Sequence, residues 1–190
     1  MNKNRLEAFS DGVLAIIITI MVLELKVPHD SSLSALKPLI PVFMSYLLSF
    51  IYVGIYWNNH HHMMQLVKKV NGKVLWANLH LLFWLSLFPF ATAWMGENHF
   101  ATWPVVVYGC IMFMAAMAYF ILESTLKKLH GADSEFANTF GTTLKDTISC
   151  LAYLVAIAGS FITPWIGIAC YIFVAVIWFI PERRVEKQLK

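Results

Sequence analysis

Residues 5–25 read RLEAFSDGVLAIIITIMVLEL, and this stretch decides the class of fold. The part from Gly12 to Leu23 carries no charge, but its 12 residues are too few to cross a hydrocarbon core, which needs about 20. A helix that begins at Leu6 supplies the missing length, and it brings Asp11 into the membrane or to its edge. The stretch therefore predicts a transmembrane helix that carries an acidic residue.

The rest of the chain has the composition of a membrane protein. Of the 190 residues 59% are hydrophobic and 13% are charged, roughly half the charge of an average soluble domain. We expect an all-α, polytopic membrane protein in which residues 1–190 form one domain of six transmembrane helices. The predicted spans are residues 6–25, 39–57, 74–95, 103–122, 147–162 and 165–180, with a polar cytoplasmic linker at 130–145.

The positive charges give an independent test of that number of helices. Cytoplasmic loops of membrane proteins collect lysine and arginine. With six spans and the amino terminus inside, only Lys26 and Lys37 of the 14 basic residues lie outside. The other twelve are Lys3, Arg5, Lys68, Lys69, Lys73, Lys127, Lys128, Lys145, Arg183, Arg184, Lys187 and Lys190. Both termini are therefore predicted to face the cytoplasm.

The first helix holds the candidate functional residues. A charge inside the membrane costs about 2.5–3.5 kcal/mol on insertion scales, so Asp11 is a site candidate by default. Steps of three and four residues also place one stripe along this helix, whose members are Arg5, Phe9, Gly12, Ile16, Thr19 or Ile20, and Leu23. Ser10 and Asp11 lie beside the stripe. By pattern alone, a membrane anchor with a packing face fits the same residues equally well.

Other chemical signals are weak. His60, His61, His62 and His80 suggest a metal site, because imidazole is a common ligand. Consecutive histidines on a helix point 100° apart, however, and neither cysteine nor carboxylate groups accompany them. We predict no intrinsic metal and no cofactor. The chain shows no catalytic constellation, and its basic residues form no single patch, so neither an enzyme nor a nucleic-acid partner is expected.

The stretch at residues 5–25 resembles the signature of the transmembrane protein 175 family, whose first helix opens with an arginine, three residues and then Phe-Ser-Asp. Tyr56 and Trp57 followed by His60 resemble its second helix, and WANLHLLFWLSLFPFAT at residues 76–92 resembles its third. The similarity is close in the amino-terminal half. From about Trp103 onward only the number of spans agrees.

This resemblance implies a potassium-selective channel that lacks the TVGYG filter of the usual potassium channels, as this sequence also does. It implies a homotetramer in the bacterial plasma membrane, with the first helices lining a central pore and potassium as the permeant ion. Carried onto this chain, the pore residues are Ile16, Thr19, Ile20 and Leu23. Their apolar rings would form a hydrophobic constriction, and the Thr19 hydroxyl would hold ion-bound water.

A second set of residues is expected to hold the first helix in place. These residues are Arg5, Phe9, Ser10, Asp11, Trp57, His60 and Asn78, and their polar groups would form a network among the first three helices. Voltage-sensor arginine spacing and a ligand domain are both absent, so we expect a leak-like, weakly gated conductance. Two alternatives stay open: a proton-permeable channel, and a cation-coupled secondary transporter that uses Asp11.

Overall fold

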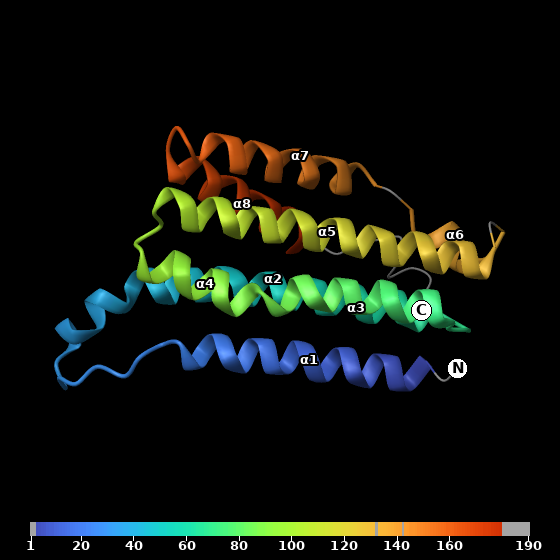
Figure 1. Cartoon of the computed structure of the whole chain (residues 1–190), viewed down its shortest axis with the longest axis horizontal. Helices are drawn as coiled ribbons and strands as arrows, with labels where there is room; N and C mark the ends of the chain where they lie inside the picture. The colour runs from blue at the N-terminus through green and yellow to red at the C-terminus, as the bar shows by residue number, and fades with distance from the viewer. Residues whose placement is uncertain (1–2, 132, 142, 180–190) are drawn as a thin grey trace.

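The computed structural model of the chain describes residues 3–131, 133–141 and 143–179, in which every regular element is helical (Figure 1). The elements are α1 (Lys3–Leu23), the 3-10 helix η1 (Leu33–Leu39), α2 (Ile40–Gln65), α3 (Gly72–Ser86), α4 (Phe88–Glu97), α5 (Thr102–His130), α6 (Glu135–Thr139), α7 (Leu144–Gly159) and α8 (Pro164–Phe179). The predicted all-α class is confirmed. Ile180, which would end the last span, and Arg183, Arg184, Lys187 and Lys190 lie outside the described residues.

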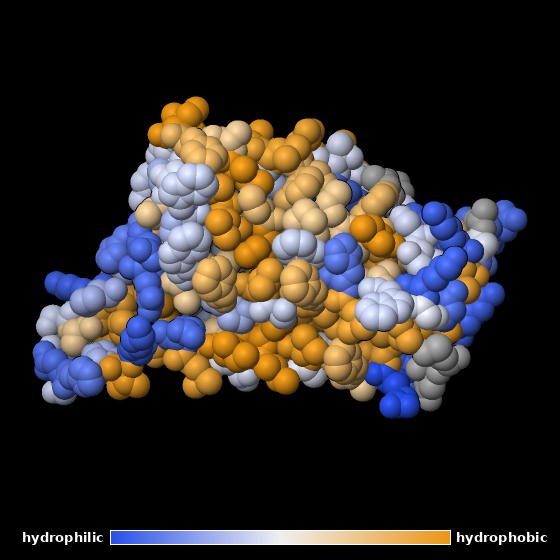
Figure 2. Space-filling model, in the orientation of Figure 1, coloured by the Kyte–Doolittle hydropathy of each residue, from blue (hydrophilic) through white to orange (hydrophobic). Residues whose placement is uncertain are grey.

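The lengths of the helices and their surface identify a membrane protein. Four helical segments are long and apolar enough to span a bilayer: Lys3–Leu23, Leu33–Gln65, Gly72–Glu97 and Thr102–His130. Figure 2 shows a broad apolar band across the middle of the molecule, with hydrophilic residues at both ends. Helix α7 is apolar but has only 16 residues, and α8 is apolar over the 16 residues that the structure describes. The chain is a multi-pass membrane protein, and the number of six spans stays a prediction.

The long helices run along one axis and alternate in direction. The amino terminus, the loop between α2 and α3 and the linker between α5 and α7 lie at one end, which we call the N-terminal end (Figure 1). The connections α1–α2, α4–α5 and α7–α8 lie at the opposite end. Lysines in or beside the connections of the described chain follow the same division, with Lys68, Lys69 and Lys73 at the N-terminal end and Lys26 and Lys37 at the other.

Two helices are longer than the sequence predicted. Helix α2 continues to Gln65 instead of ending near residue 57, and α5 continues to His130 instead of residue 122. Both predictions stopped where the apolar run ended. In the structure His60 on the added part of α2 is buried, and so is Glu123 on the added part of α5. Tertiary packing of polar side chains therefore extends both helices beyond their hydrophobic stretches.

The predicted third span is divided into two helices. Helix α3 ends at Ser86 and α4 begins at Phe88, with Leu87 between them, so the span that was expected at 74–95 is interrupted. Pro89 lies in the first turn of α4, where a missing N–H costs nothing. Within one continuous helix its ring would clash with the carbonyl group of Leu85. The break therefore has a local cause, and the two helices keep nearly the same direction (Figure 1).

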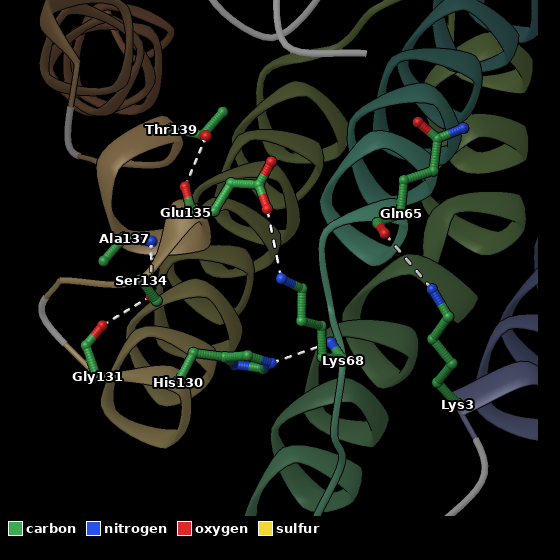
Figure 3. A network of polar contacts seen from close by, with 9 residues as sticks. All are labelled: Lys3, Gln65, Lys68, His130, Gly131, Ser134, Glu135, Ala137 and Thr139. Carbon is green, nitrogen blue, oxygen red and sulfur yellow. Dashed lines mark hydrogen bonds and ion pairs between the residues drawn. The ribbon is translucent and has the colours of Figure 1, made fainter.

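The predicted linker at 130–145 is partly helical and is tied to the α2–α3 loop. Figure 3 shows the Lys68 backbone N–H donating to Nε2 of His130 at 3.1 Å, while Nζ of Lys68 lies 3.5 Å from a Glu135 carboxylate oxygen. Nδ1 of His130 lies 2.9 Å from the Leu126 carbonyl oxygen, which can only accept. His130 therefore carries its proton on Nδ1 and accepts with Nε2. This arrangement holds the end of α5 against the loop.

Helix α8 packs closely on α5 at Gly109. A Cβ atom added there would overlap the Tyr171 hydroxyl and lie 3.1 Å from its Cζ atom. The same hydroxyl donates to the Val105 carbonyl oxygen at 2.8 Å. The absence of a side chain at Gly109 lets the ring of Tyr171 reach the backbone of α5, so a hydrogen bond connects the C-terminal hairpin to the rest of the bundle.

Candidate functional site

Helix α1 has one face packed against the bundle and one face without a partner. Its buried residues are Leu6, Ser10, Leu14, Ile17 and Met21, which follow steps of three and four along the helix. This face contacts α2, α3 and α4. The opposite face is the stripe that the sequence predicted, and no part of the described chain covers it. We call this face the exposed stripe: Arg5, Phe9, Gly12, Ile16, Thr19, Ile20 and Leu23.

The exposed stripe is apolar in most of its length but has two features that lipid contact does not require. Ile16 is 58% exposed and Leu23 is 78% exposed in the single chain. Between the large side chains lies Gly12, where an added Cβ atom would meet nothing within 4 Å. Thr19 places a hydroxyl group on the same face. From Phe9 to Leu23 the stripe therefore combines bulky apolar side chains with one polar group, the Thr19 hydroxyl.

The geometry of Thr19 limits what its hydroxyl can do. The hydroxyl donates to the carbonyl oxygen of Ile16 in its own helix, at 2.8 Å. Because its one proton is used there, the oxygen presents its lone pairs outward as a hydrogen-bond acceptor. Such an oxygen can accept from water or face a cation, and it cannot at the same time donate to an anion. The site is thus suited to the hydration shell of a cation.

A buried chain of hydrogen bonds connects α2, α3 and α1. Nε2 of His60 lies 2.8 Å from Oδ1 of Asn78, and Nδ2 of Asn78 donates to Oγ of Ser10 at 2.9 Å. Oγ of Ser10 donates in turn to the Leu6 carbonyl oxygen at 2.9 Å. The amide oxygen of Asn78 can only accept, so His60 donates through Nε2. The hydrogen bonds therefore all run in one direction, from α2 through α3 to α1. All three side chains are buried.

Asp11 belongs to a separate contact on the surface of the same helices. Nε1 of Trp57 donates to Oδ1 of Asp11 at 3.0 Å, and the Trp57 ring stacks on His61 with centroids 5.6 Å apart. Both Asp11 and Trp57 are exposed in the single chain. The sequence prediction joined these residues to Ser10, His60 and Asn78 in one network. The structure instead has a buried chain and an exposed pair, on neighbouring sides of α1.

Arg5 and Phe9 are in neither group. The sequence placed both on the stripe and also in the polar network. Both lie on the exposed stripe, and within the described part of the chain no hydrogen bond or ion pair connects Arg5 to the network. The physical reason is their angular position. They share the face of Ile16, about a third of a turn away from Ser10. Their side chains therefore point away from α2 and α3.

Sequence reasoning missed a second set of polar contacts toward the opposite end of the bundle. Oγ1 of Thr92 donates to Oγ of Ser49 at 2.7 Å, and Ser49 lies 3.0 Å from the Tyr108 hydroxyl. The Thr92 hydroxyl also lies 3.8 Å from the sulfur of Met21 on α1. The spacing of Ser45, Ser49 and Tyr52 on one face of α2 was the available signal. The Thr92 proton is used in the bond to Ser49, so Met21 is held by packing, and its burial fixes α1 at a second level far from Ser10.

Beyond α1, an ion pair marks the end of the exposed stripe. Nζ of Lys26 lies 2.8 Å from a Glu97 carboxylate oxygen, which raises the pKa of Lys26 by hydrogen bonding and by charge attraction. Both side chains are exposed, so the pair contributes little to stability. It connects the loop that follows Leu23 to the end of α4. As for metals, no group of three or more His, Cys, Asp or Glu side chains gathers within residues 3–131, 133–141 and 143–179.

Comparison with known proteins gives consistent matches. The family described as "Endosomal/lysosomal potassium channel TMEM175" matches residues 5–89. A protein of Chryseobacterium sp. (strain P1-3) named as a potassium channel is 58% identical over 190 residues, covering 100% of this chain and 99% of that protein. A chicken (Gallus gallus) protein named as endosomal/lysosomal proton channel TMEM175 is 29% identical over 141 residues, covering 66% of this chain and 28% of that protein.

A solved structure has a similar fold. It is the crystal structure of a lysosomal potassium-selective channel TMEM175 homolog from Chamaesiphon minutus, with a TM-score of 0.78 and 31% sequence identity. The match covers 93% of this chain and 95% of that chain. It extends well beyond residue 89, so the C-terminal half, where the sequence pattern gave only a number of spans, shares the same fold.

Proposed function

This chain belongs to the TMEM175 family of ion channels, and from that premise we propose that it is a potassium channel whose pore is lined by the exposed stripe of α1. The Chryseobacterium relative is named as a potassium channel, and the Chamaesiphon homolog is described as potassium-selective. Membership in a channel family also agrees with the prediction that the chain is not an enzyme and needs no cofactor.

The observation that carries the proposal is the unpartnered face of α1. The opposite face is fixed to the bundle at Ser10 and again near Met21, so α1 is held while Ile16, Thr19 and Leu23 point away from the chain. We propose a homotetramer in which four copies of this face surround the ion path. Such an assembly would give Gly12 the close neighbours that it lacks in one chain.

The proposed constriction is hydrophobic. Four copies of Ile16, Ile20 and Leu23 would form apolar rings through which an ion passes only by losing part of its hydration. Thr19 lies between the first two rings on the helix and offers an acceptor oxygen. We propose that this oxygen holds water of the permeant cation, so that the potassium ion is selected next to the apolar rings. The conductance is leak-like and weakly gated in this proposal.

The proposed topology has six spans with the N-terminal end in the cytoplasm of a bacterial cell and the channel in its plasma membrane. Lysines gather in the loops at that end, in agreement with the positive-inside rule. Helix α7, with 16 residues, would be about 24 Å long at 1.5 Å per residue, somewhat less than a typical hydrocarbon core. A locally thinner bilayer accommodates helices of this length.

We propose that Ser10, His60 and Asn78, together with Asp11 and Trp57, form a scaffold and do not line the ion path. The first three are buried between helices, and the Trp57 indole compensates part of the cost of keeping Asp11 charged near the membrane. Arg5 and Phe9 are proposed instead to line the cytoplasmic entrance, because they lie on the exposed stripe two turns and one turn before Gly12, respectively.

Flux through reconstituted liposomes tests the proposal. Vesicles with an outward potassium gradient should develop a potential close to the potassium equilibrium value, and replacing potassium by sodium should abolish it. The variant Ile16→Asn should raise the conductance and reduce selectivity, because it wets the proposed constriction. Ile172→Asn on α8 is the matched control, since Ile172 is 51% exposed but away from α1. Unchanged conductance in Ile16→Asn would remove this face from the ion path.

A proton-permeable channel is the second candidate, because the chicken relative is named as a proton channel. The same liposomes with a pH gradient and a proton-sensitive dye separate the two functions. Proton flux without a potassium-driven potential would favour this candidate over the first. The coupled-transporter alternative loses its support, because the relatives are named as channels.

A further inference from the structure

A cavity lies between helices α2, α5, α7 and α8, away from the exposed stripe. Its volume is about 340 Å³, and α1 contributes no residue to its lining. The lining includes Tyr52 and Tyr56 of α2, Glu123 of α5, Asp146 and Cys150 of α7, and Trp178 of α8. The cavity is therefore a feature separate from the proposed pore.

The walls of the cavity change in character along its length. Tyr52, on α2, is buried at the deep end, toward the middle of the bundle. Glu123 and Asp146 lie nearer the N-terminal end, because α5 runs toward that end and α7 begins there. Six aromatic side chains contribute to the lining: Tyr52, Tyr56, Tyr119, Phe120, Tyr153 and Trp178. An apolar, aromatic interior thus meets two acidic groups at one end.

The charge of the lining favours a cation. Both charged residues that line the cavity are acidic, and among the described residues no lysine or arginine lines it. Glu123 forms an ion pair with Lys127 at 2.8 Å, and Asp146 accepts from Thr143 as part of a helix cap. These contacts fix the two carboxylates in place. Lys127 balances the charge of Glu123, whereas Asp146 accepts from the neutral N–H and hydroxyl groups of Thr143, so Asp146 supplies the negative charge within the lining.

One aromatic wall already receives an ammonium group. Nζ of Lys145 lies 5.9 Å from the centroid of the Trp178 ring. A cation at that distance from a tryptophan face is within the range of a cation–π interaction. Aromatic walls are the environment in which proteins bind quaternary ammonium ligands, and a primary ammonium group such as that of lysine is attracted to the same ring faces. The chemistry of the cavity therefore matches an organic cation.

The volume limits the size of that cation. About 340 Å³ is at the lower end of the range for small-molecule sites, and a phospholipid with two acyl chains is far larger. We propose that the cavity binds a hydrophobic amine, with its single chain or ring among the tyrosines and its protonated nitrogen beside Glu123 and Asp146. This site does not depend on what ion the channel conducts.

Cys150 provides a direct measurement of occupancy. Its thiol lines the cavity, whereas Cys110 is exposed on α5 outside the lining. The purified full chain in nanodiscs is alkylated with N-ethylmaleimide, and the rate at each cysteine is followed by peptide mass spectrometry. Decylamine is expected to slow the labelling of Cys150 and to leave that of Cys110 unchanged. Decanol and decanoate, which have the same chain length, are expected to need roughly tenfold higher concentrations or more, because they lack the cation.

Substitutions distinguish recognition of the ligand's charge from binding of its alkyl chain. Glu123→Gln should reduce the preference for decylamine over decanol, whereas Glu135→Gln, on an exposed carboxylate outside the cavity, should not. Ala116→Phe should fill the cavity and abolish protection of Cys150, with Ile121→Phe on the lipid-facing side of α5 as its control. Equal protection by all three compounds, or no protection by any, overturns the proposal. Size-exclusion chromatography shows which variants are folded, and if Glu123→Gln fails to fold, Ala116→Phe still decides.

Discussion

The hydrogen-bond chain through Asn78 gives a quantitative test of how α1 is held. The side chain of Asn78 is fully buried, accepts from His60 at 2.8 Å and donates to Ser10 at 2.9 Å. Asn78→Leu keeps a similar volume but removes both bonds and leaves the imidazole N–H of His60 without its acceptor. Hydrogen bonds inside membrane proteins contribute about 0.6 kcal/mol on average and up to about 1.7 kcal/mol. We expect Asn78→Leu to lower the free energy of unfolding by about 1–3 kcal/mol.

A double-mutant cycle isolates the bond between α3 and α1. Ser10→Ala, Asn78→Leu and the double variant are unfolded in lipid bicelles, and their free energies of unfolding are compared with that of the parent chain. The coupling energy between the two positions should be about 0.6–1.7 kcal/mol, because only one direct bond joins them. Ser86→Ala is the control partner, since the exposed Ser86 also bonds to a carbonyl of its own helix but contacts no other helix through its hydroxyl.

Two results would contradict the interpretation that this hydrogen bond holds α1. A coupling within about 0.3 kcal/mol of zero between Ser10 and Asn78 would mean that this bond does not hold α1, and the scaffold interpretation would be wrong. The same variants should keep their potassium-over-sodium preference in liposomes, since the chain of bonds lies on the buried face. A large change of selectivity without loss of stability would place these residues in the ion path instead.

Three further predictions follow from the site and the packing. Thr19→Val keeps the shape of the side chain but removes the acceptor oxygen, so it should reduce the potassium-over-sodium preference. Thr19→Ser keeps the oxygen and should retain most of that preference. Equal reversal potentials in the two variants would exclude a role of the hydroxyl in ion selection. Asp11→Ala removes the partner of an indole N–H and should lower the tetramer yield in detergent more than it changes selectivity, which gel filtration and flux measure separately. Gly109→Ala forces its Cβ atom against Tyr171 and should cost about 1–3 kcal/mol of stability, while Gly54→Ala, with open space around it, should cost nothing in the same thermal-unfolding assay.

The sequence alone determined the membrane class and the stripe along α1, and it predicted the orientation of the helices. These properties depend on composition, on the placement of lysines and on a period of 3.6 residues, all of which are local. Spacing alone placed Phe9 and Ile16 on one stripe with Ser10 beside it, and in the structure Phe9 and Ile16 are exposed while Ser10 is buried. The resemblance at residues 5–25 was enough to predict the family.

Only the tertiary structure decided which polar groups meet. Helix α2 continues through its polar residues because His60 hydrogen-bonds to Asn78 on α3. Asn78 in turn donates to Ser10, which is 68 residues away in sequence. The periodicity of each helix predicts which side chains share a face, but not which face of another helix they will contact. For the same reason the sequence left Arg5 between the stripe and the polar network, and the cavity beside Glu123 could not be anticipated. Contacts between helices depend on rotation and depth, and only packing sets these.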